Sequence, residues 1–274
     1  MAQALSERAG GLTVWARRPQ TIESIEGLFP FHAADSVASL GEVCDVVAIC
    51  VDRDSDVEQL LVDQGLLAAM KPGTVIVNHG TGSPAAARRF ASLSQGRVDI
   101  LDAPVSGGGE KARRRTLTMM VGGSRPAFDR CMGLFESCAS IVRYLGGAGS
   151  GQLAKLINNA LLAMNMWSVE EILAVAKGMG LGVESLTEIL LASSGSSVAL
   201  EQLTGTSADL LLHYREMLGK DVSEFETVVA SFDLPSTNTV EVARQGVDGI
   251  PSAIALLGRT AHGANLAVSA NRGN

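Results

Sequence analysis

The chain has 274 residues, of which 46% are hydrophobic and 19% are charged, and its formal net charge at pH 7 is -7. This composition is that of a folded globular protein and excludes a disordered one. The negative charge argues against nucleic acid as the main partner. We expect no membrane, because no run of eighteen apolar residues lacks charges, and no signal peptide is visible.

The basic run and the cysteines of the chain indicate structural roles and no binding site. The densest basic run, KARRR at 111–115, favours a solvated helix face or turn. The four cysteines, at positions 44, 50, 131 and 138, lack the spacing of metal ligands, so no metal site is predicted. We interpret them as buried free thiols in a reducing compartment and expect a cytoplasmic protein.

The chain opens with MAQALSERAGGLTVWARRP, which predicts the end of a helix over 1–8, a break at Gly10 and Gly11, and a strand over 12–16. A strand that follows a helix and a tight turn and ends in basic residues is typical of the second strand of a nucleotide-binding βαβ unit. We therefore expect a first strand and a glycine-rich turn, on the order of fifteen to twenty residues, ahead of Met1.

Apolar, β-branched runs then alternate with helical patterns up to about residue 148. Strands are predicted at 44–51, 74–80, 98–105, 116–123 and 141–145, and helices at 55–62, at 83–95 and after Ser124. Ser83 as an N-cap with Pro84 at the first helical position marks a clear helix start. Alternation of this kind predicts a parallel sheet covered by helices.

Beyond residue 148 the strand signals vanish. A helix over 150–179 is apolar on most of its circumference, so we expect it to be largely buried. Further helices are predicted at about 183–193, 208–232, 236–246 and 252–260. The predicted fold class is therefore α/β: a Rossmann-type doubly wound parallel sheet over 1–148, incomplete at its N-terminus, followed by an all-helical domain over 149–274.

Three motifs carry candidate chemistry. In the first, glycines at 146–151 precede a helix whose N-terminus favours an anionic group. Lys155 and Asn159 follow on one face of that helix and could hold and protonate a substrate oxygen, although a lysine at a domain boundary beside a satisfied amide has the same spacing.

The second motif is DAPVSGGG at 102–109, at the end of a predicted strand. Ligands of open α/β sheets bind beyond the carboxyl ends of the strands, and a serine followed by glycines offers donors to a carboxylate. A flexible turn is the alternative interpretation. The third motif, the pair Lys220–Asp221, by itself indicates only a surface salt bridge.

Together these motifs make the sequence similar to the β-hydroxyacid dehydrogenase family, which includes 3-hydroxyisobutyrate dehydrogenase and tartronate semialdehyde reductase. The resemblance is carried by DAPVSGG (102–108), TLTMMVGG (116–123), GQLAKLINN (151–159) and KD (220–221), and extends over residues 1–18. It covers nearly the whole chain, and it implies an NAD(P)-binding domain over 1–148, incomplete at its N-terminus, and a helical substrate and dimerisation domain over 149–274.

The resemblance implies roles for individual residues. Lys155 would be the catalytic acid/base, with Asn159 beside it on the substrate, and the substrate carboxylate would be held by Ser106, Gly107 and Gly108. The residues implied near the cofactor are Val51, Asp52, Thr81, Lys220 and Asp221. Four positions depart from the family pattern: Val51 and Asp52 replace its Leu-Pro turn, and Asn78 and Gly80 replace the Asp and Ser of its D-x-S-T turn. VDGIPSA (247–253) matches the family's late Asp-x-Ser segment only loosely.

These residues imply hydride transfer between a nicotinamide and a small β-hydroxy acid or its semialdehyde. We expect a neighbouring cation, Lys220, to lower the pKa of Lys155 toward the operating pH. NADP is predicted over NAD, because Arg17 and Arg18 end the second strand where NAD-preferring folds place an acidic residue. Solvated turn residues are the alternative interpretation of this arginine pair.

Two other functions stay open. One is an imine or other carbonyl reductase on the same scaffold, although such enzymes usually replace the lysine. The other is a non-catalytic, truncated homologue, because a domain without its first strand and glycine turn should bind a dinucleotide poorly. A homo-oligomer is implied by resemblance.

Overall fold

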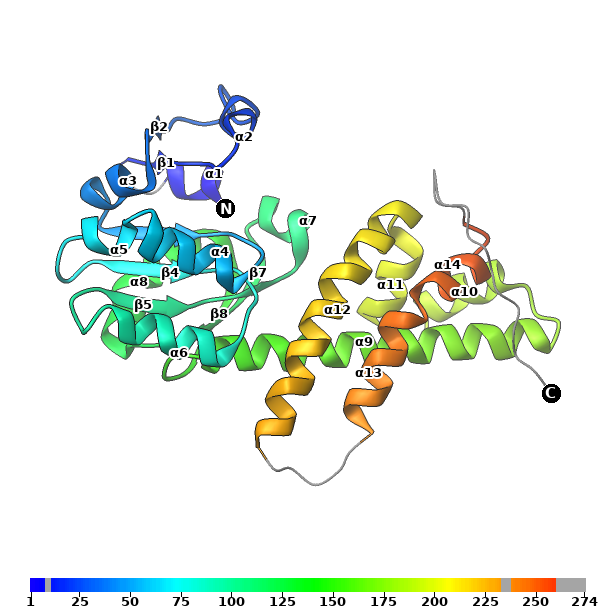
Figure 1. Ribbon diagram of the computed structural model, residues 1–274. Coiled ribbons are helices and arrows are strands. Elements are labelled where there is room, and N and C mark those ends of the chain that lie inside the picture. Colours follow the sequence, from blue (N-terminus) through cyan, green and yellow to red (C-terminus); the bar gives the residue numbers. More distant parts are fainter. Residues whose placement is uncertain (8–10, 233–237, 260–274) are drawn as a thin grey trace. The chain divides into compact units, whose positions relative to one another are not determined.

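The computed structural model describes residues 1–7, 11–232 and 238–259 (Figure 1). They fall into two compact units, Met1–Ile157 and Asn158–Asn274. The predictions for Arg8 and Gly10, for the start of the helix at 236–246 and for residue 260 lie outside the described residues. No described helix is both long enough and apolar enough to cross a membrane.

The first unit is an α/β domain. Its strands are β1 (Thr13–Val14), β2 (His32–Ala33), β3 (Val46–Ile49), β4 (Val75–Asn78), β5 (Asp99–Asp102), β6 (Val105–Ser106), β7 (Leu117–Gly122) and β8 (Ala139–Gly146). Its helices are α1 (Ala2–Ser6), α2 (Pro19–Glu23), α3 (Val37–Val43), α4 (Asp54–Glu58) with the π-helical turn η1 (Gln59–Asp63), α5 (Leu66–Ala69), α6 (Pro84–Leu93), α7 (Gly108–Arg113) and α8 (Arg125–Cys138).

The main sheet has the order β3-β4-β5-β7-β6, with β8 also paired to β7. β3, β4 and β5 are parallel, as predicted, whereas β7 runs antiparallel to β5 and β6 and parallel to β8. The alternation of strand and helix patterns does not encode strand direction, so the sequence did not predict the antiparallel pairs of β7 with β5 and β6. Both faces of β4 are buried, with Ile76 in one apolar cluster and Val75 and Val77 in the other, which explains its continuous apolar run.

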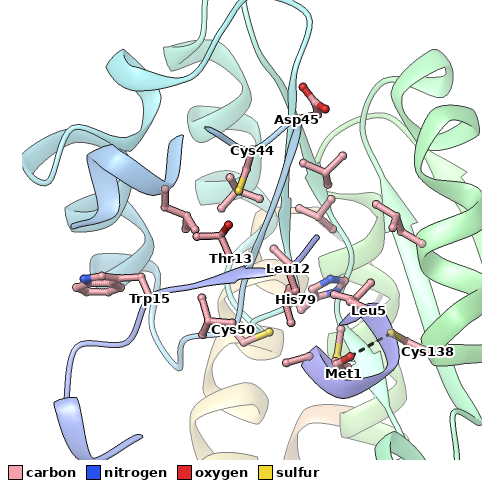
Figure 2. Close-up of a pocket in the computed structure, with 18 of the residues that line it drawn as sticks. Met1, Leu5, Leu12, Thr13, Trp15, Cys44, Asp45, Cys50, His79 and Cys138 are labelled. Atoms are coloured by element: carbon pink, nitrogen blue, oxygen red, sulfur yellow. Dashed lines mark hydrogen bonds between the residues drawn. The ribbon is translucent and has the colours of Figure 1, made fainter. Parts of the chain in front are cut away.

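β1 and β2 form a separate two-stranded parallel sheet. A cavity of about 590 Å³ is lined by Thr13 and Val14 of β1, by Val46 and Val47 of β3, and by Phe135 of α8 (Figure 2). Within the described residues, β1 pairs with β2 and β3 pairs with β4, and neither pairs across this cavity. The doubly wound strand order places its first strand between these two. A strand and glycine turn ahead of Met1 stay a prediction.

The remaining helices are α9 (Ser150–Gly178), α10 (Val183–Leu191), α11 (Val198–Gly205), α12 (Ala208–Ser231), α13 (Thr239–Asp248) and α14 (Ile250–Leu256). The described residues of the second unit form helices and connecting loops and contain no strand, as the sequence predicted. α11 was missed, although Ser197 caps it by accepting a hydrogen bond from the Leu200 N–H. α12 packs against both α13 and α14.

The prediction that the helix at 150–179 is largely buried was wrong. Four of its large apolar side chains are about half exposed: Ile157, Leu161, Ile172 and Val175. Leu156, Met166 and Leu173 of the same helix are fully buried. The helix therefore has apolar residues on both its packed and its exposed faces, and apolarity around a whole helix does not by itself locate the core.

Candidate active site

The carboxyl ends of β3, β4 and β5 lie level with one another. Ile49 pairs with Asn78 and Asn78 pairs with Asp102, so the three strands end in register. The segments that follow, which begin at Cys50, His79 and Ala103, therefore leave the sheet along one edge. This is the edge at which open α/β sheets bind their ligands.

Asp102 caps the N-terminus of α9. Its Oδ1 accepts a hydrogen bond from the Gly149 N–H at 2.8 Å and its Oδ2 accepts one from the Gln152 N–H at 2.9 Å. Burial raises the pKa of this carboxyl, and the backbone donors of α9 act in the opposite direction. The sequence indicated that this helix end favours an anion, and the anion that lies there is the protein's own carboxylate.

Gln152 ties the loop after β4 to the same turn of α9. Its Oε1 accepts from the Gly82 N–H at 2.9 Å, and its Nε2 donates to the Gly80 carbonyl at 2.7 Å. Thr81, a predicted cofactor residue, is thus bracketed by two fixed backbone groups. A Cβ added at Gly80 would overlap the carbonyl of Val51, so the loop lies directly against the segment after β3.

The substrate-loop candidates follow β5. Ser106 ends β6 and is partly buried. Gly107 and Gly108 have φ angles of +131° and +63°, which L side chains rarely adopt, so this turn requires glycine at both positions. The basic run after it is exposed on α7 and its end, where Arg113 and Arg114 pair with Glu110, in agreement with a solvated helix face.

Lys155 and Asn159 lie one turn apart on α9, as the spacing predicted. Lys155 is partly buried. Asn159 is buried, and its Nδ2 donates to Asp221 Oδ2 at 2.6 Å. Asp221 Oδ1 in turn lies 3.4 Å from the Lys220 ammonium. The Lys220–Asp221 pair, which alone indicated a surface salt bridge, is therefore linked through a buried carboxylate to the asparagine of α9.

The two arginines after β1 differ in their partners. Arg17 Nη2 lies 2.8 Å from Asp56 Oδ1 of α4. Arg18 is the N-cap residue of α2 and is exposed. A 2′-phosphate that binds Arg17 would therefore have to compete with Asp56. Arg18 takes no part in that ion pair.

His79 and three of the four cysteines, Cys44, Cys50 and Cys138, line the cavity (Figure 2). His79 lines the cavity, and its Nδ1 lies 2.8 Å from the Ala103 carbonyl, so this nitrogen carries the donated hydrogen. Cys131 and Cys138 are buried free thiols as predicted, but Cys50 is exposed and Cys44 only half-buried because both line the cavity. No cluster of three His, Cys, Asp or Glu side chains suited to a metal ion occurs in the described part of the chain.

Sequence reasoning missed the roles of Asp54, Asp102 and Gln152. Asp102 and Gln152 stand inside the motifs that carry the resemblance, but their partners are 47 to 72 residues away. The Ser83 N–H that donates to Asp54 is 29 residues from it. No local spacing rule finds such contacts. An acidic residue ending a buried strand, and a glutamine in the first turn of an apolar helix, were the available signals.

Comparison with known proteins assigns this architecture. A family model described as the NAD binding domain of 6-phosphogluconate dehydrogenase matches residues 1–146. A second, described as NAD-binding of NADP-dependent 3-hydroxyisobutyrate dehydrogenase, matches residues 149–245. An uncharacterised oxidoreductase of Mycobacterium tuberculosis is 32% identical over 255 residues, which cover 86% of this chain and 84% of the relative. The chain belongs to the β-hydroxyacid dehydrogenase family.

Two further relatives bear on this family assignment. The NAD-dependent L-serine dehydrogenase of Pseudomonas aeruginosa is 40% identical over 171 residues, which cover 62% of this chain and 57% of the relative, so the match spans less than two thirds of that protein. The crystal structure of 3-hydroxyisobutyrate dehydrogenase from Salmonella typhimurium has a TM-score of 0.76 at 24% identity and covers 94% of each chain. This likeness confirms the predicted fold, a Rossmann-type α/β domain followed by a helical domain.

Proposed function

We propose that this β-hydroxyacid dehydrogenase transfers a hydride between NADP(H) and a small β-hydroxy acid or its semialdehyde, with Lys155 as the general acid/base. The observation that supports it best is the first turn of α9. That turn is fastened to the segment after β4 through Gln152 and to the end of β5 through Asp102, and Lys155 follows it on the same helix.

The residues at this edge fit the nicotinamide end of the cofactor. Thr81 carries a hydroxyl, and its neighbours on both sides, Gly80 and Gly82, have no side chains. Family resemblance assigns Lys220 and Asp221 to the same end of the cofactor. Val51 borders the loop from the segment after β3, and Asp52 follows it in the chain. No described residue is assigned to the pyrophosphate of the cofactor.

The chain's own residues supply binding and proton transfer. When bound, the nicotinamide supplies or accepts the hydride. Ser106 with the backbone of Gly107 and Gly108 binds the substrate carboxylate, Asn159 orients the substrate oxygen, and Lys155 gives that oxygen a proton in reduction or takes one in oxidation. Because Asp221 already accepts from Asn159 Nδ2, the Asn159 side chain is held in one orientation for this contact.

The substrate proposal draws on chemistry shared with the relatives. L-Serine and 3-hydroxyisobutyrate both carry a hydroxyl on the carbon next to the one bearing the carboxylate. An assay should therefore offer both acids, the semialdehyde of a hydroxy acid, and a cyclic imine, each with NADP(H) and NAD(H). Turnover of the hydroxy acids and loss of at least 10³-fold in Lys155→Ala are the expected results. Near-normal turnover in a folded, cofactor-bound Lys155→Ala enzyme would refute the role of Lys155, and turnover of the imine alone would replace the substrate class.

Cofactor preference is a separate part of the proposal. NADP(H) is supported by the absence of an acidic residue at 15–19 and by two guanidinium groups there. The relative that is 40% identical is named for NAD. Comparing kcat/KM for the two cofactors decides the matter, and a preference for NAD(H) would overturn this assignment.

We also infer that the protein acts as a homo-oligomer. The support is the half-exposed apolar side chains of α9, including Leu161, Ile172 and Val175, since apolar patches of this kind mark contact surfaces. Light scattering at several concentrations should give a mass above that of one chain, and Leu161→Glu should lower it. A monomer at all concentrations would contradict the inference.

A further inference from the structure

We propose that Gln152 is a positioning residue: its carboxamide holds the loop Gly80–Gly82 at a fixed place relative to Lys155. The proposal rests on the proposed function for its kinetic consequences. It assigns a role to a side chain that touches neither hydride donor nor acceptor and that acts through the backbone around Thr81.

The two hydrogen bonds of Gln152 have opposite polarity. The Oε1 atom accepts from the Gly82 N–H at 2.9 Å, and the Nε2 atom donates to the Gly80 carbonyl at 2.7 Å. A primary amide carries its acceptor and its donors on two separate atoms, so it can do both at once, and this pairing also fixes which way the amide is turned. Gln152 is 1% exposed, so water does not replace either bond when one is lost.

The loop has little room to move away from Gln152. A Cβ added at Gly80 would overlap the Val51 carbonyl, and one added at Gly82 would overlap the Asp54 carboxylate. Asp54 Oδ2 also accepts from the Ser83 N–H at 2.8 Å. The loop is therefore enclosed by the segment after β3 and by α4, and Gln152 fastens it to α9.

The backbone of Gln152 is itself anchored. Its N–H donates to Asp102 Oδ2 at 2.9 Å, and Asp102 is 3% exposed at the end of β5. A Cβ added at Gly151 would lie 2.6 Å from the Asp102 carbonyl, so α9 begins in direct contact with that strand end. Through this one turn of α9, the loop that carries Thr81 and the helix that carries Lys155 share one anchor.

Lys155 lies three residues after Gln152, on the following turn of the same helix. If the loop shifts relative to α9, the cofactor bound against Thr81 shifts relative to the proton donor. Misplacement of reacting groups by about 1 Å costs on the order of 100-fold in rate. Loss of the Gln152 carboxamide should therefore affect turnover and cofactor binding more than binding of the hydroxy acid.

The test uses two variants and one control in the full chain. Gln152→Met keeps the length of the side chain and removes both bonds, whereas Gln152→Glu, in its ionised form, keeps an acceptor for Gly82 and loses the donor to Gly80. The control is Gln245→Met in α13, the same chemical change at an exposed helix position whose amide bonds Glu241. In the oxidation direction, Gln152→Met should lower kcat/KM for NADP⁺ by about 10- to 100-fold and leave the KM for the hydroxy acid within about threefold. Gln152→Glu should fall between it and the wild type.

A readout that needs no activity separates this proposal from the proposed function. Amide hydrogen exchange over 79–83 should be at least about tenfold faster in Gln152→Met than in the wild type, with exchange over β4 unchanged. Unchanged exchange and unchanged cofactor kinetics would overturn the proposal, and so would a lower Tm without either effect, because Gln152 would then be a structural residue only. If the wild type turns over no substrate, the proposed function fails, and faster exchange over 79–83 still supports the positioning role.

Discussion

The partly buried position of His79 makes the stability of the α/β unit depend on pH. Burial lowers the pKa of His79 to about 4 from an ordinary value of 6.5, while the hydrogen bond to the Ala103 carbonyl acts in the opposite direction. The unfolded chain therefore binds a proton between pH 6.5 and pH 4 that the folded chain does not. Stability from this group is complete above pH 6.5 and is lost as the pH falls toward 4.

The size of the effect follows from the two pKa values. A shift of about 2.5 units corresponds to about 3.4 kcal/mol over the whole window. About 2 kcal/mol of this is lost between pH 7 and pH 5. These free energies are upper limits, because His79 lines the cavity and is only half-buried, and solvent at the ring reduces the cost of charging it.

The replacement that tests this reasoning is His79→Asn, which keeps an N–H donor for the Ala103 carbonyl and cannot titrate in this range. The chain has two tryptophans, so a Trp167→Phe background leaves Trp15, which packs against the core of the α/β unit, as the fluorescent reporter. Urea unfolding at pH 5 and pH 7 should show a larger loss of stability at pH 5 in the histidine protein, by up to about 2 kcal/mol. Equal pH dependence in the two proteins would refute the assignment of this slope to His79.

Three further predictions concern packing, the buried network and the cofactor. Gly246→Ala should destabilise the helical unit by about 1–3 kcal/mol in urea unfolding, because its Cβ would overlap the Ala163 carbonyl of α9, whereas Gly205→Ala, whose Cβ meets no atom within 4 Å, should be neutral or stabilising. Asp221→Ala should cost about 1–3 kcal/mol in the same assay, because it removes the acceptor of a buried asparagine amide, and an unchanged unfolding midpoint would contradict this. Arg18→Ala should raise the Kd for NADPH about tenfold and leave the Kd for NADH unchanged in fluorescence titrations, and an equal effect on both would argue against a 2′-phosphate contact.

Local signals predicted much of the fold. The helix expected over 83–95 is observed as α6 at Pro84–Leu93, and the Ser83 side chain caps it by accepting from the Ala85 N–H. The helix expected over 150–179 is observed as α9 at Ser150–Gly178. In both cases the start is set by residues within one turn, which a single sequence reveals. The direction of β7 and the burial of α9 depend on partners elsewhere, and both were misjudged or left open.

The site divides along the same physical line. Lys155 and Asn159 could be paired from their spacing, because one helix fixes their relative position. The link from Asn159 to Asp221 could not, because it joins positions 62 residues apart whose local patterns are unremarkable. Asp102 belongs to a recognised motif, but the residues around it in the sequence did not reveal its hydrogen-bond partners. The fold shows that it lies at the helix end where the sequence indicated an anion.

The occupied helix end changes how this site can recognise its ligand. The N-terminus of α9 offers the positive end of a helix dipole, but the Asp102 carboxylate already accepts from two of its N–H groups. A substrate carboxylate placed there would meet a like charge and would have to displace a buried one, which is costly. Anion binding must therefore come from elsewhere at this edge of the sheet, and Ser106 with the two glycines that follow is the proposed place. The Asp102 carboxyl fixes the start of α9, and the same helix carries Lys155, the proposed acid/base.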